Sequence, residues 1–391
     1  MCIEFVRMKA LFLHILSKKK KEAKTALKIL CVFGTRPEGV KMCPLVRELR
    51  KRERFCVRVC VTGQHRELLK DALDAFSVSP DLDLSVMREG QSLASLTAAV
   101  LTGVSAYLQS ESPDLLLVHG DTATAFASAL AAFYLQIPVA HVEAGLRTYD
   151  MQSPFPEEWN RRALSLLARY HFAPTALARE NLLREGVCED AVFVTGNTVL
   201  DALKSTVSAE YYHPLLARCA GKRLLLLTAH RRENVGAPMQ SIFRAVRRVC
   251  EREKDLCVVY PVHPNPAVRK TAEEVFAGCE NLFMTEPLGV LDFHNILARC
   301  ELVLTDSGGV QEEAAALGIP ALVLRTHTER EEGVESGALR LVGTDEEKVY
   351  ESICRLLEDE EERRRMAHSE NPFGDGSACE RIAEILEKVL G

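Results

Sequence analysis

From residue 28 onward, short runs of apolar residues alternate with longer runs whose apolar positions recur at helical spacing. Runs that are apolar at every position are typical of strands buried on both faces, and their alternation with helices predicts a parallel, doubly wound α/β sheet. The expected helices include Leu93–Leu108, Ala123–Tyr134 and Glu157–Ala168. The expected strands of the first half are Ile29–Phe33, Val57–Thr62, Asp114–His119, Ile137–Val142 and a shorter one near Val192–Thr195.

The same rhythm restarts in the second half and predicts a second sheet. Its expected strands are Arg223–Leu227, Leu256–Val262, Leu282–Thr285, Leu302–Thr305 and Pro320–Leu324. We place the domain boundary near Gly196, because Thr195-Gly196-Asn197-Thr198 is typical of a strand end, a turn and a helix cap. The predicted organisation is an N-terminal extension over residues 1–27, an N-terminal domain over 28–196, a C-terminal domain over 197–375, and a last helix within 376–391 that can pack across the domains.

Two Rossmann-like, doubly wound domains that face each other leave a central cleft. The carboxyl ends of both sheets line such a cleft, and open α/β sheets bind their ligands there. At 391 residues the chain is long enough for two domains of this kind. The residues that directly follow each expected strand are therefore the first candidates for chemistry.

Composition and charge limit the partners. The net charge of -6 argues against a general nucleic-acid-binding protein, which is normally basic, so an anionic ligand has to be held by a few placed cations and backbone amides. The 13 cysteines include no CxxC pair, and several lie in apolar strand-like runs, such as Cys31, Cys60 and Cys257. We expect these cysteines to be small buried hydrophobic residues, which fits the reducing cytoplasm.

The first residues are no typical export signal. The apolar run Ala10–Leu16 precedes Lys18–Lys21, whereas a secretory signal carries its charge before the apolar run. A membrane span needs roughly 20 apolar residues, and we expect no stretch of the chain to be long enough. The sequence therefore predicts a cytoplasmic protein without a membrane partner.

Charged residues follow the expected strands of the first half. Arg36 and Lys41 lie near the start of a helix, after Gly34, where cations and backbone amides can hold an anion; they can equally be two solvated cations. Asp121 and Glu143 each follow a strand, and Glu157 begins a helix. Taken singly, Asp121 can be a helix cap, and Glu157 an acid favoured by the helix dipole, as can Glu158 beside it. Three acids that converge on one cleft are instead suited to acid and base catalysis.

In the second half, His230 follows the first expected strand and can contact a phosphate or a leaving group. His263, which lies in a proline-rich turn, is better suited to a structural or supporting role. Further on, Ser307-Gly308-Gly309 opens a helix and exposes backbone N–H groups suited to a diphosphate. An acid one turn later can accept hydrogen bonds from ribose hydroxyls. The sequence shows no GxGxxG fingerprint and no metal-ligand spacing, so we expect neither a nicotinamide cofactor nor a metal.

Seven segments together resemble the non-hydrolysing UDP-N-acetylglucosamine 2-epimerases, in the same order and spacing from about residue 28 to the C-terminus. The segments are Gly34-Thr35-Arg36-Pro37-Glu38, Val61-Thr62-Gly63-Gln64-His65-Arg66, His119-Gly120-Asp121-Thr122, His141-Val142-Glu143-Ala144-Gly145-Leu146-Arg147, Thr195-Gly196-Asn197-Thr198, His230-Arg231-Arg232-Glu233 and Asp306-Ser307-Gly308-Gly309-Val310-Gln311-Glu312-Glu313.

The resemblance implies a fold like that of the GT-B glycosyltransferases, a homodimer and a UDP-sugar substrate. It implies acid and base roles for Asp121, Glu143 and Glu157, with His230 near the diphosphate or the sugar. Phe293 would lie near the uracil. The residues that would contact the UDP-sugar are Arg36, Lys41, Ser307, Gly308, Gly309, Glu313 and Arg330.

The chemistry of the sugar favours elimination over oxidation. The hydrogen on C2 is not acidic, but breaking the bond between C1 and UDP places positive charge next to it and eases its removal. The alternatives are a glycosyltransferase with the same fold, a 2-epimerase of a modified sugar such as a 2,3-diacetamido uronic acid, and a UDP-sugar sensor without activity.

Overall fold

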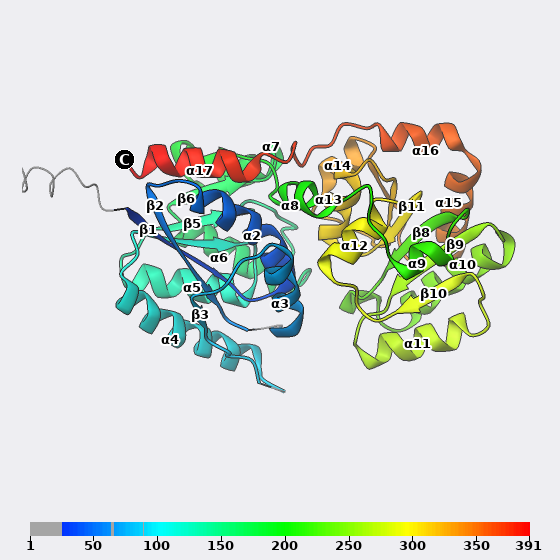
Figure 1. Cartoon of the computed structure of the whole chain (residues 1–391), viewed down its shortest axis with the longest axis horizontal. Coiled ribbons are helices and arrows are strands. Elements are labelled where there is room, and N and C mark those ends of the chain that lie inside the picture. The colour runs from blue at the N-terminus through cyan, green and yellow to red at the C-terminus, as the bar shows by residue number, and fades with distance from the viewer. Residues whose placement is uncertain (1–25, 64–65, 89) are drawn as a thin grey trace, which may run out of the picture.

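The computed structural model describes residues 26–63, 66–88 and 90–391, which form two parallel sheets, each covered by helices (Figure 1). The strands of the first sheet are β1 (Leu27–Phe33), β2 (Phe55–Val61), β3 (Leu82–Asp83), β4 (Leu115–His119), β5 (Val139–Val142), β6 (Tyr170–Ala173) and β7 (Val192–Val194). Their order in the sheet is β3-β2-β1-β4-β5-β6-β7, and every neighbouring pair is parallel.

The second sheet repeats this plan. Its strands are β8 (Arg223–Thr228), β9 (Leu256–Pro261), β10 (Leu282–Thr285), β11 (Leu302–Thr305), β12 (Ala321–Val323) and β13 (Leu339–Leu341). They are parallel in the order β10-β9-β8-β11-β12-β13. The order reverses between β1 and β4 in the first sheet and between β8 and β11 in the second, which is where doubly wound sheets open a ligand crevice.

The helices form the outer layers. With the first sheet lie α2 (Arg36–Arg50), α3 (Arg66–Ala75), α4 (Leu93–Glu111), α5 (Ala123–Tyr134), α6 (Glu157–Leu167), α7 (Ala176–Arg184) and the 3₁₀ turn η1 (Glu189–Ala191). The chain continues with α8 (Val199–Thr206), α9 (Pro214–Arg218), the 3₁₀ turn η2 (Arg232–Asn234), α10 (Ala237–Arg252), α11 (Pro266–Phe276), α12 (Val290–Leu297), α13 (Gly308–Ala316), α14 (Glu331–Glu335), α15 (Glu346–Glu358), α16 (Glu360–Ala367) and α17 (Ala378–Val389).

The alternating apolar pattern gives the predicted fold class. Each predicted strand is present, with ends that differ by two residues or fewer, and the predicted helix Ala123–Tyr134 has the observed bounds. The prediction omitted β3, β6 and β13. Two of these strands lie at sheet edges, and β6 follows α6 after only two residues, so no turn residue separates the two apolar runs.

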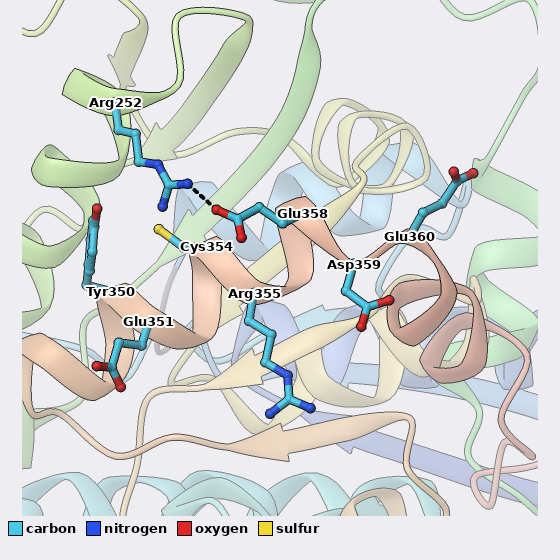
Figure 2. A pocket seen from close by; sticks show the side chains of 8 residues that line it. All are labelled: Arg252, Tyr350, Glu351, Cys354, Arg355, Glu358, Asp359 and Glu360. Carbon is cyan, nitrogen blue, oxygen red and sulfur yellow. Dashed lines mark hydrogen bonds and ion pairs between the residues drawn. The ribbon is translucent and has the colours of Figure 1, made fainter.

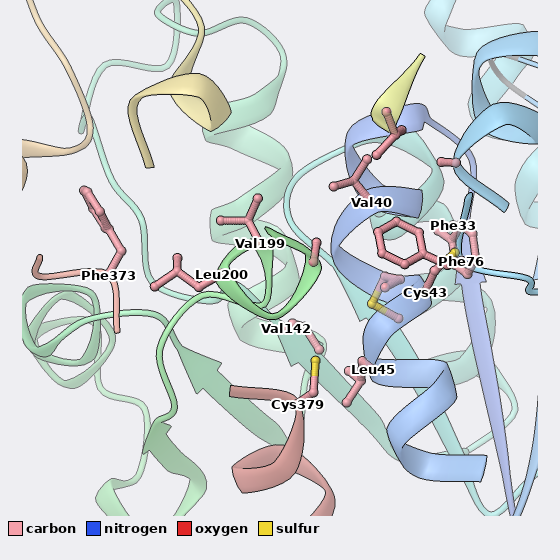
Figure 3. Close-up of a cluster of buried hydrophobic side chains, with 14 of the residues drawn as sticks. Phe33, Val40, Cys43, Leu45, Phe76, Val142, Val199, Leu200, Phe373 and Cys379 are labelled. Carbon is pink, nitrogen blue, oxygen red and sulfur yellow. The ribbon is translucent and has the colours of Figure 1, made fainter. Parts of the chain in front are cut away.

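A continuous apolar core joins the two halves of the molecule. It includes Phe33 of β1, Val40 of α2, Val199 of α8, and Phe373 and Cys379 near the C-terminus (Figure 3). The last helix, α17, packs on α2 and α8 and so returns the chain to the first half (Figure 1).

The chain passes between the two sheets twice, before α8 and before α17, and the two crossings lie against each other. The amide of Asn197 donates to the carbonyl of Phe373 at 2.8 Å. Gly196 and Gly374 make this approach possible, because a Cβ on Gly374 would lie 3.0 Å from the Cα of Gly196. The carboxylate of Asp201 accepts the first amides of α17 and ties this helix to α8.

Two expectations from the sequence need correction. The helix α4 is long and apolar enough to cross a membrane by length and composition, contrary to the expectation that no such stretch exists. In the structure one face of this helix is buried, and Leu96, Val100, Val104 and Leu108 pack it into the core of the first sheet.

The second correction concerns the cysteines. Cys219 and Cys257 form a disulfide, so the expectation of a free buried thiol is wrong for Cys257. It is correct for Cys31 and Cys60, which are free and buried. The expected extension lies outside the described residues up to position 25, and Leu27 already begins β1.

Candidate active site

Glu143 lies at the centre of the facing strand ends. It directly follows β5, adopts a φ of 61°, and its side chain is nine-tenths buried. One carboxylate oxygen, Oε2, accepts from the ammonium of Lys41 and, at 2.8 Å, from Nδ2 of Asn197; Nε2 of His119 lies 3.6 Å from it. Burial alone would raise the pKa of Glu143, but Lys41, His119 and Arg330 lower it well below its ordinary value. Glu143 is therefore a buried, ionised carboxylate.

Lys41 joins the two halves of the site. Its ammonium also donates to Oε2 of Glu312, on α13, at 2.9 Å. Burial alone would lower the pKa of Lys41, but Glu143 and Glu312 raise it above its ordinary value. Glu312 in turn accepts from Nε of Arg330 at 3.0 Å, and Arg330 also pairs with Glu329. A chain of alternating buried charges thus runs from β5 to the second sheet layer.

Asp121 follows β4 and Gly120. The helix-cap alternative is wrong for it, because the side chain of Thr122 caps α5 by accepting the amide of Ala125. The carboxylate of Asp121 instead accepts from the guanidinium of Arg161, and its carbonyl accepts from Nδ2 of Asn160 at 2.8 Å. A Cβ on Gly120 would lie 3.8 Å from Oε1 of Glu143, so the loops that carry Asp121 and Glu143 are adjacent.

Glu157 is the first residue of α6, in the position that favours an acid at a helix N-terminus. Its pKa is raised, first by burial and then by the nearby charge of Asp121, while Arg231 and Arg161 oppose the shift. Glu158 has a different, structural role. It is fully buried and accepts the backbone amides of Thr148 and Tyr149.

The second half contributes the start of α13 to this site. Ser307 is the N-cap of α13, its side chain makes no capping hydrogen bond, and the amides of the first turn point away from the helix. A Cβ on Gly308 would lie 2.7 Å from Nη1 of Arg330, whereas one on Gly309 would meet open space. Arg330, through Glu312 and Lys41, links this turn to Glu143.

His230 is held beside the same turn. Oδ2 of the buried Asp306 accepts the amides of His230 and Arg231 and Nδ2 of Asn234, each at 2.9 Å. The imidazole of His230 stacks on that of His263 with 5.2 Å between ring centroids, and its Nε2 lies 4.0 Å from Oδ1 of Asp306. Asp306, the residue directly before Ser307, therefore holds the backbone of His230 and Arg231 beside the start of α13.

A third group of residues lies where the α2 start faces α13. Arg36 has a lowered pKa because burial outweighs the opposing charges of Asp71 and Glu313. Nε2 of His294 lies 3.7 Å from Oε1 of Glu313, and the ring of Phe293 lies next to that of His294. Within the described ranges, Oε2 of Glu313 is buried and has no hydrogen-bond partner.

The structure thus brings the sequence candidates into one interdomain region. Sequence reasoning missed Arg161, Asn197, Asp306 and Glu312, which hold the candidates in place. For Asp306 the signal was its position directly after an apolar strand; the other three lie inside helices or turns and carry no such mark.

Two further observations concern a metal site and a surface hollow outside this interdomain region. In the part of the chain that the structure describes, no group of three His, Cys, Asp or Glu side chains could hold a metal ion. An open hollow lies on the surface of the second half, between α10 and α15, and Arg252, Tyr350, Cys354 and Glu358 are among its lining residues (Figure 2). It includes none of the candidates above.

Comparison with known proteins relates the chain to one family. The family model described as UDP-N-acetylglucosamine 2-epimerase matches residues 47–387. The chain is 52% identical to the UDP-N-acetylglucosamine 2-epimerase of Bacillus subtilis over 92% of this chain and 95% of that protein. It is 46% identical to the enzyme of that name in Escherichia coli K12, with 92% and 98% covered.

A solved structure shows the same architecture. The crystal structure of the UDP-GlcNAc 2-epimerase from Neisseria meningitidis bound to UDP-GlcNAc matches with a TM-score of 0.89 and 42% identity over 93% of this chain and 100% of that chain. Together with the matching fold and the family model, this similarity shows that the chain belongs to the UDP-N-acetylglucosamine 2-epimerase family.

Proposed function

We propose that the protein interconverts UDP-N-acetylglucosamine and UDP-N-acetylmannosamine by eliminating UDP and adding it back. The observation that carries the proposal is the position of the carboxyl groups. Asp121, Glu143 and Glu157 come from one domain and lie beside a chain of charges that leads, through Lys41 and Arg330, to the helix start of the other. Relatives solved with UDP-GlcNAc support the UDP-sugar as substrate.

The reaction balances without a redox partner. The bond between C1 and the phosphate oxygen breaks, and UDP leaves with the electron pair. A carboxylate takes the proton from C2, and the C2–H electrons form the C1=C2 bond of 2-acetamidoglucal. A second acid then delivers a proton to the opposite face of C2 while UDP attacks C1. One carboxyl group must therefore be ionised while another is protonated, and each general acid or base contributes about 10²–10⁴-fold to the rate.

The environment of the three acids suits this demand. Lys41 and Asn197 hold Glu143 as a carboxylate, whereas burial favours the protonated form of Glu157. Asp121 is paired with Arg161. We assign proton transfer at C2 to Asp121, Glu143 and Glu157 together.

The remaining candidates bind the nucleotide in this scheme. Arg36, Lys41 and Arg330 neutralise the diphosphate, helped by the amides of Ser307, Gly308 and Gly309, and His230 assists the departing phosphate oxygen. The free Oε2 of Glu313 accepts a ribose hydroxyl, and Phe293 packs against the uracil. The buried position of this unpaired oxygen, within the described residues, supports the assignment because an unpaired buried acceptor is costly.

We further propose that the enzyme is a cytoplasmic homodimer that supplies a precursor of cell-surface polysaccharide. Phe133, Tyr134, Trp159 and Leu166 are large, exposed and carried by the adjacent helices α5 and α6, which supports a partner surface there. Light scattering after gel filtration tests the dimer, and Leu166→Asp should yield monomers.

The experiment that tests the function is an incubation with UDP-N-acetylglucosamine alone in deuterated water. The expected result is UDP-N-acetylmannosamine with deuterium at C2. Epimerisation without solvent deuterium would refute the elimination scheme. Turnover of only a 2,3-diacetamido uronic acid derivative would instead identify a modified-sugar epimerase, and turnover only with an added acceptor would identify a glycosyltransferase.

A further inference from the structure

Arg161 is a buried cation next to two of the acids. It lies on α6 one helical turn after Glu157, and the residue is only 4% exposed. Its Nη2 donates to Oδ2 of Asp121, and its Nη1 lies 3.4 Å from Oε2 of Glu158. Glu158 is already bound by two backbone amides, so Asp121 is the carboxylate that Arg161 serves directly.

A second buried arginine in the same domain shows what a structural role looks like. Arg147 makes four hydrogen bonds, to Leu146, to Ser165 and twice to Glu185. Arg161 makes one, to Asp121, and its Nε and Nη1 are buried without a hydrogen-bond partner in the described ranges. Unpaired buried donors are costly, so packing and stability alone do not account for Arg161.

Charged residues of the second half also influence Arg161 and Glu157. The charge of Arg231, after β8, lowers the pKa of Glu157. From the same half, the charge of Glu329 raises the pKa of Arg161 and that of Arg330 lowers it. Glu329 is already bound by Arg325 at 2.9 Å and by Arg330, so it leaves Arg161 to Asp121.

Asp121 and Glu157 thus differ in their support. Asp121 has a hydrogen-bonded cation, while Glu157 has none among the residues that the structure describes and is affected by Arg161 and Arg231 only at longer range. Burial and the nearby charge of Asp121 therefore raise the pKa of Glu157, which retains a proton more readily.

We propose that Arg161 is a positioning residue that holds the carboxyl group of Asp121 in place beside Glu157, so that the two acids meet the sugar in a fixed arrangement. The proposal rests on the proposed epimerase function. Arg161 acts through Asp121 and does not itself touch the sugar.

The test compares Arg161→Met and Arg161→Lys with the wild type, using rates of conversion of UDP-N-acetylglucosamine across the pH range. In Arg161→Met, kcat should fall by roughly 10²-fold, the lower end for one general acid or base, while KM changes by less than about threefold. Removing the guanidinium takes away a charge that lowers the pKa of Glu157, so the alkaline limb of the bell-shaped profile should move to higher pH. Arg161→Lys keeps the charge and should restore this limb toward its wild-type position.

Two controls separate positioning from folding. Arg147→Lys disturbs a buried arginine of the same domain and should lower thermal stability without moving either limb. Adding Arg161→Met to Asp121→Asn should cause little further loss of kcat, because substitutions of residues that act as one unit do not have additive effects. If Arg161→Met does not fold, Arg161→Lys against Arg147→Lys carries the comparison: reduced kcat with unchanged KM supports the proposal, and parallel behaviour of the two overturns it.

The outcomes separate the two proposals. If the wild type epimerises and Arg161→Met keeps the wild-type profile, or loses activity additively with Asp121→Asn, the role of Arg161 is refuted and the function stands. If the wild type makes no UDP-N-acetylmannosamine, both are refuted.

Discussion

Lys41→Met is the sharpest test of the buried charge network. Methionine retains most of the side-chain volume but leaves Glu143 with Asn197 and His119, and Glu312 with Arg330. Glu143 therefore loses its closest cation in a site that is nine-tenths buried. Breaking a buried ion pair on one side costs about 3–5 kcal/mol, a large part of a typical stability of about 5–15 kcal/mol.

The pH dependence gives this prediction its signature. In the wild type the pKa of Glu143 lies well below 4.5, so its stabilising effect is present above pH 4.5 and is lost as the pH falls through the lowered value. In Lys41→Met, burial is opposed by the charges of His119 and Arg330 and by the hydrogen bond from Asn197, which together are weaker than the wild-type set, and we expect the pKa of Glu143 to rise above that of the unfolded chain. The folded variant then holds a proton that the unfolded chain releases, so its stability falls as the pH rises above 4.5. The difference from the wild type should widen by up to about 1.4 kcal/mol per pH unit.

Urea unfolding at pH 4.5 and at pH 7, followed by circular dichroism, measures both values. The matched control is Lys51→Met, at the end of the same helix, whose side chain is 70% exposed and pairs with Glu48; it should stay within about 0.5 kcal/mol of the wild type. A loss in Lys41→Met below about 1 kcal/mol, or one that is equal at both pH values, would show that Lys41 does not compensate Glu143.

Three further predictions concern the glycines and metal dependence. Gly145→Ala places a Cβ 2.1 Å from the carbonyl oxygen of Ala178 and should lower the melting temperature by several degrees in a thermal scan; unchanged melting would contradict the packing. Gly308→Ala places a Cβ 2.7 Å from Nη1 of Arg330, at the end of a long side chain that can shift, so the protein should fold while KM for the UDP-sugar rises roughly tenfold, about 1.4 kcal/mol; an unchanged KM would place the diphosphate elsewhere. Treatment with a chelator should leave the turnover unchanged, because the described residues offer no metal-binding group; lost activity that a divalent ion restores would argue otherwise.

The sequence predicts the sheets well because buried parallel strands are apolar at every position, and this pattern is local. It also places Asp121, Glu143 and His230 just after strands, since a strand's carboxyl end is where an apolar run stops. The short strand β6 was missed because α6 ends only two residues before it. The pairing of Cys219 with Cys257 is set by the packing of α9 on the second sheet and leaves no mark in the spacing of the two cysteines.

The residues that pair with the candidate acids were harder to predict, because their positions depend on packing between distant elements. Arg161 and Glu312 are charged residues within helices, where the sequence favours a solvated face. Their burial depends on contacts between elements far apart in the chain: 271 positions separate Lys41 from Glu312. Thr122, by contrast, takes the cap of α5 from Asp121 through a local hydrogen bond, and one residue of register decides which side chain remains available.

The two segments that cross between the halves, at Gly196 and Gly374, restrict how the halves can move relative to each other. A single flexible connection would leave the relative orientation of the two halves free, whereas two connections that lie side by side restrict it. They leave one easy rotation, about the line that joins them, and resist twist and slide. A rotation about that line would keep the Ser307 turn in register with Glu143, as the elimination and re-addition proposed above require.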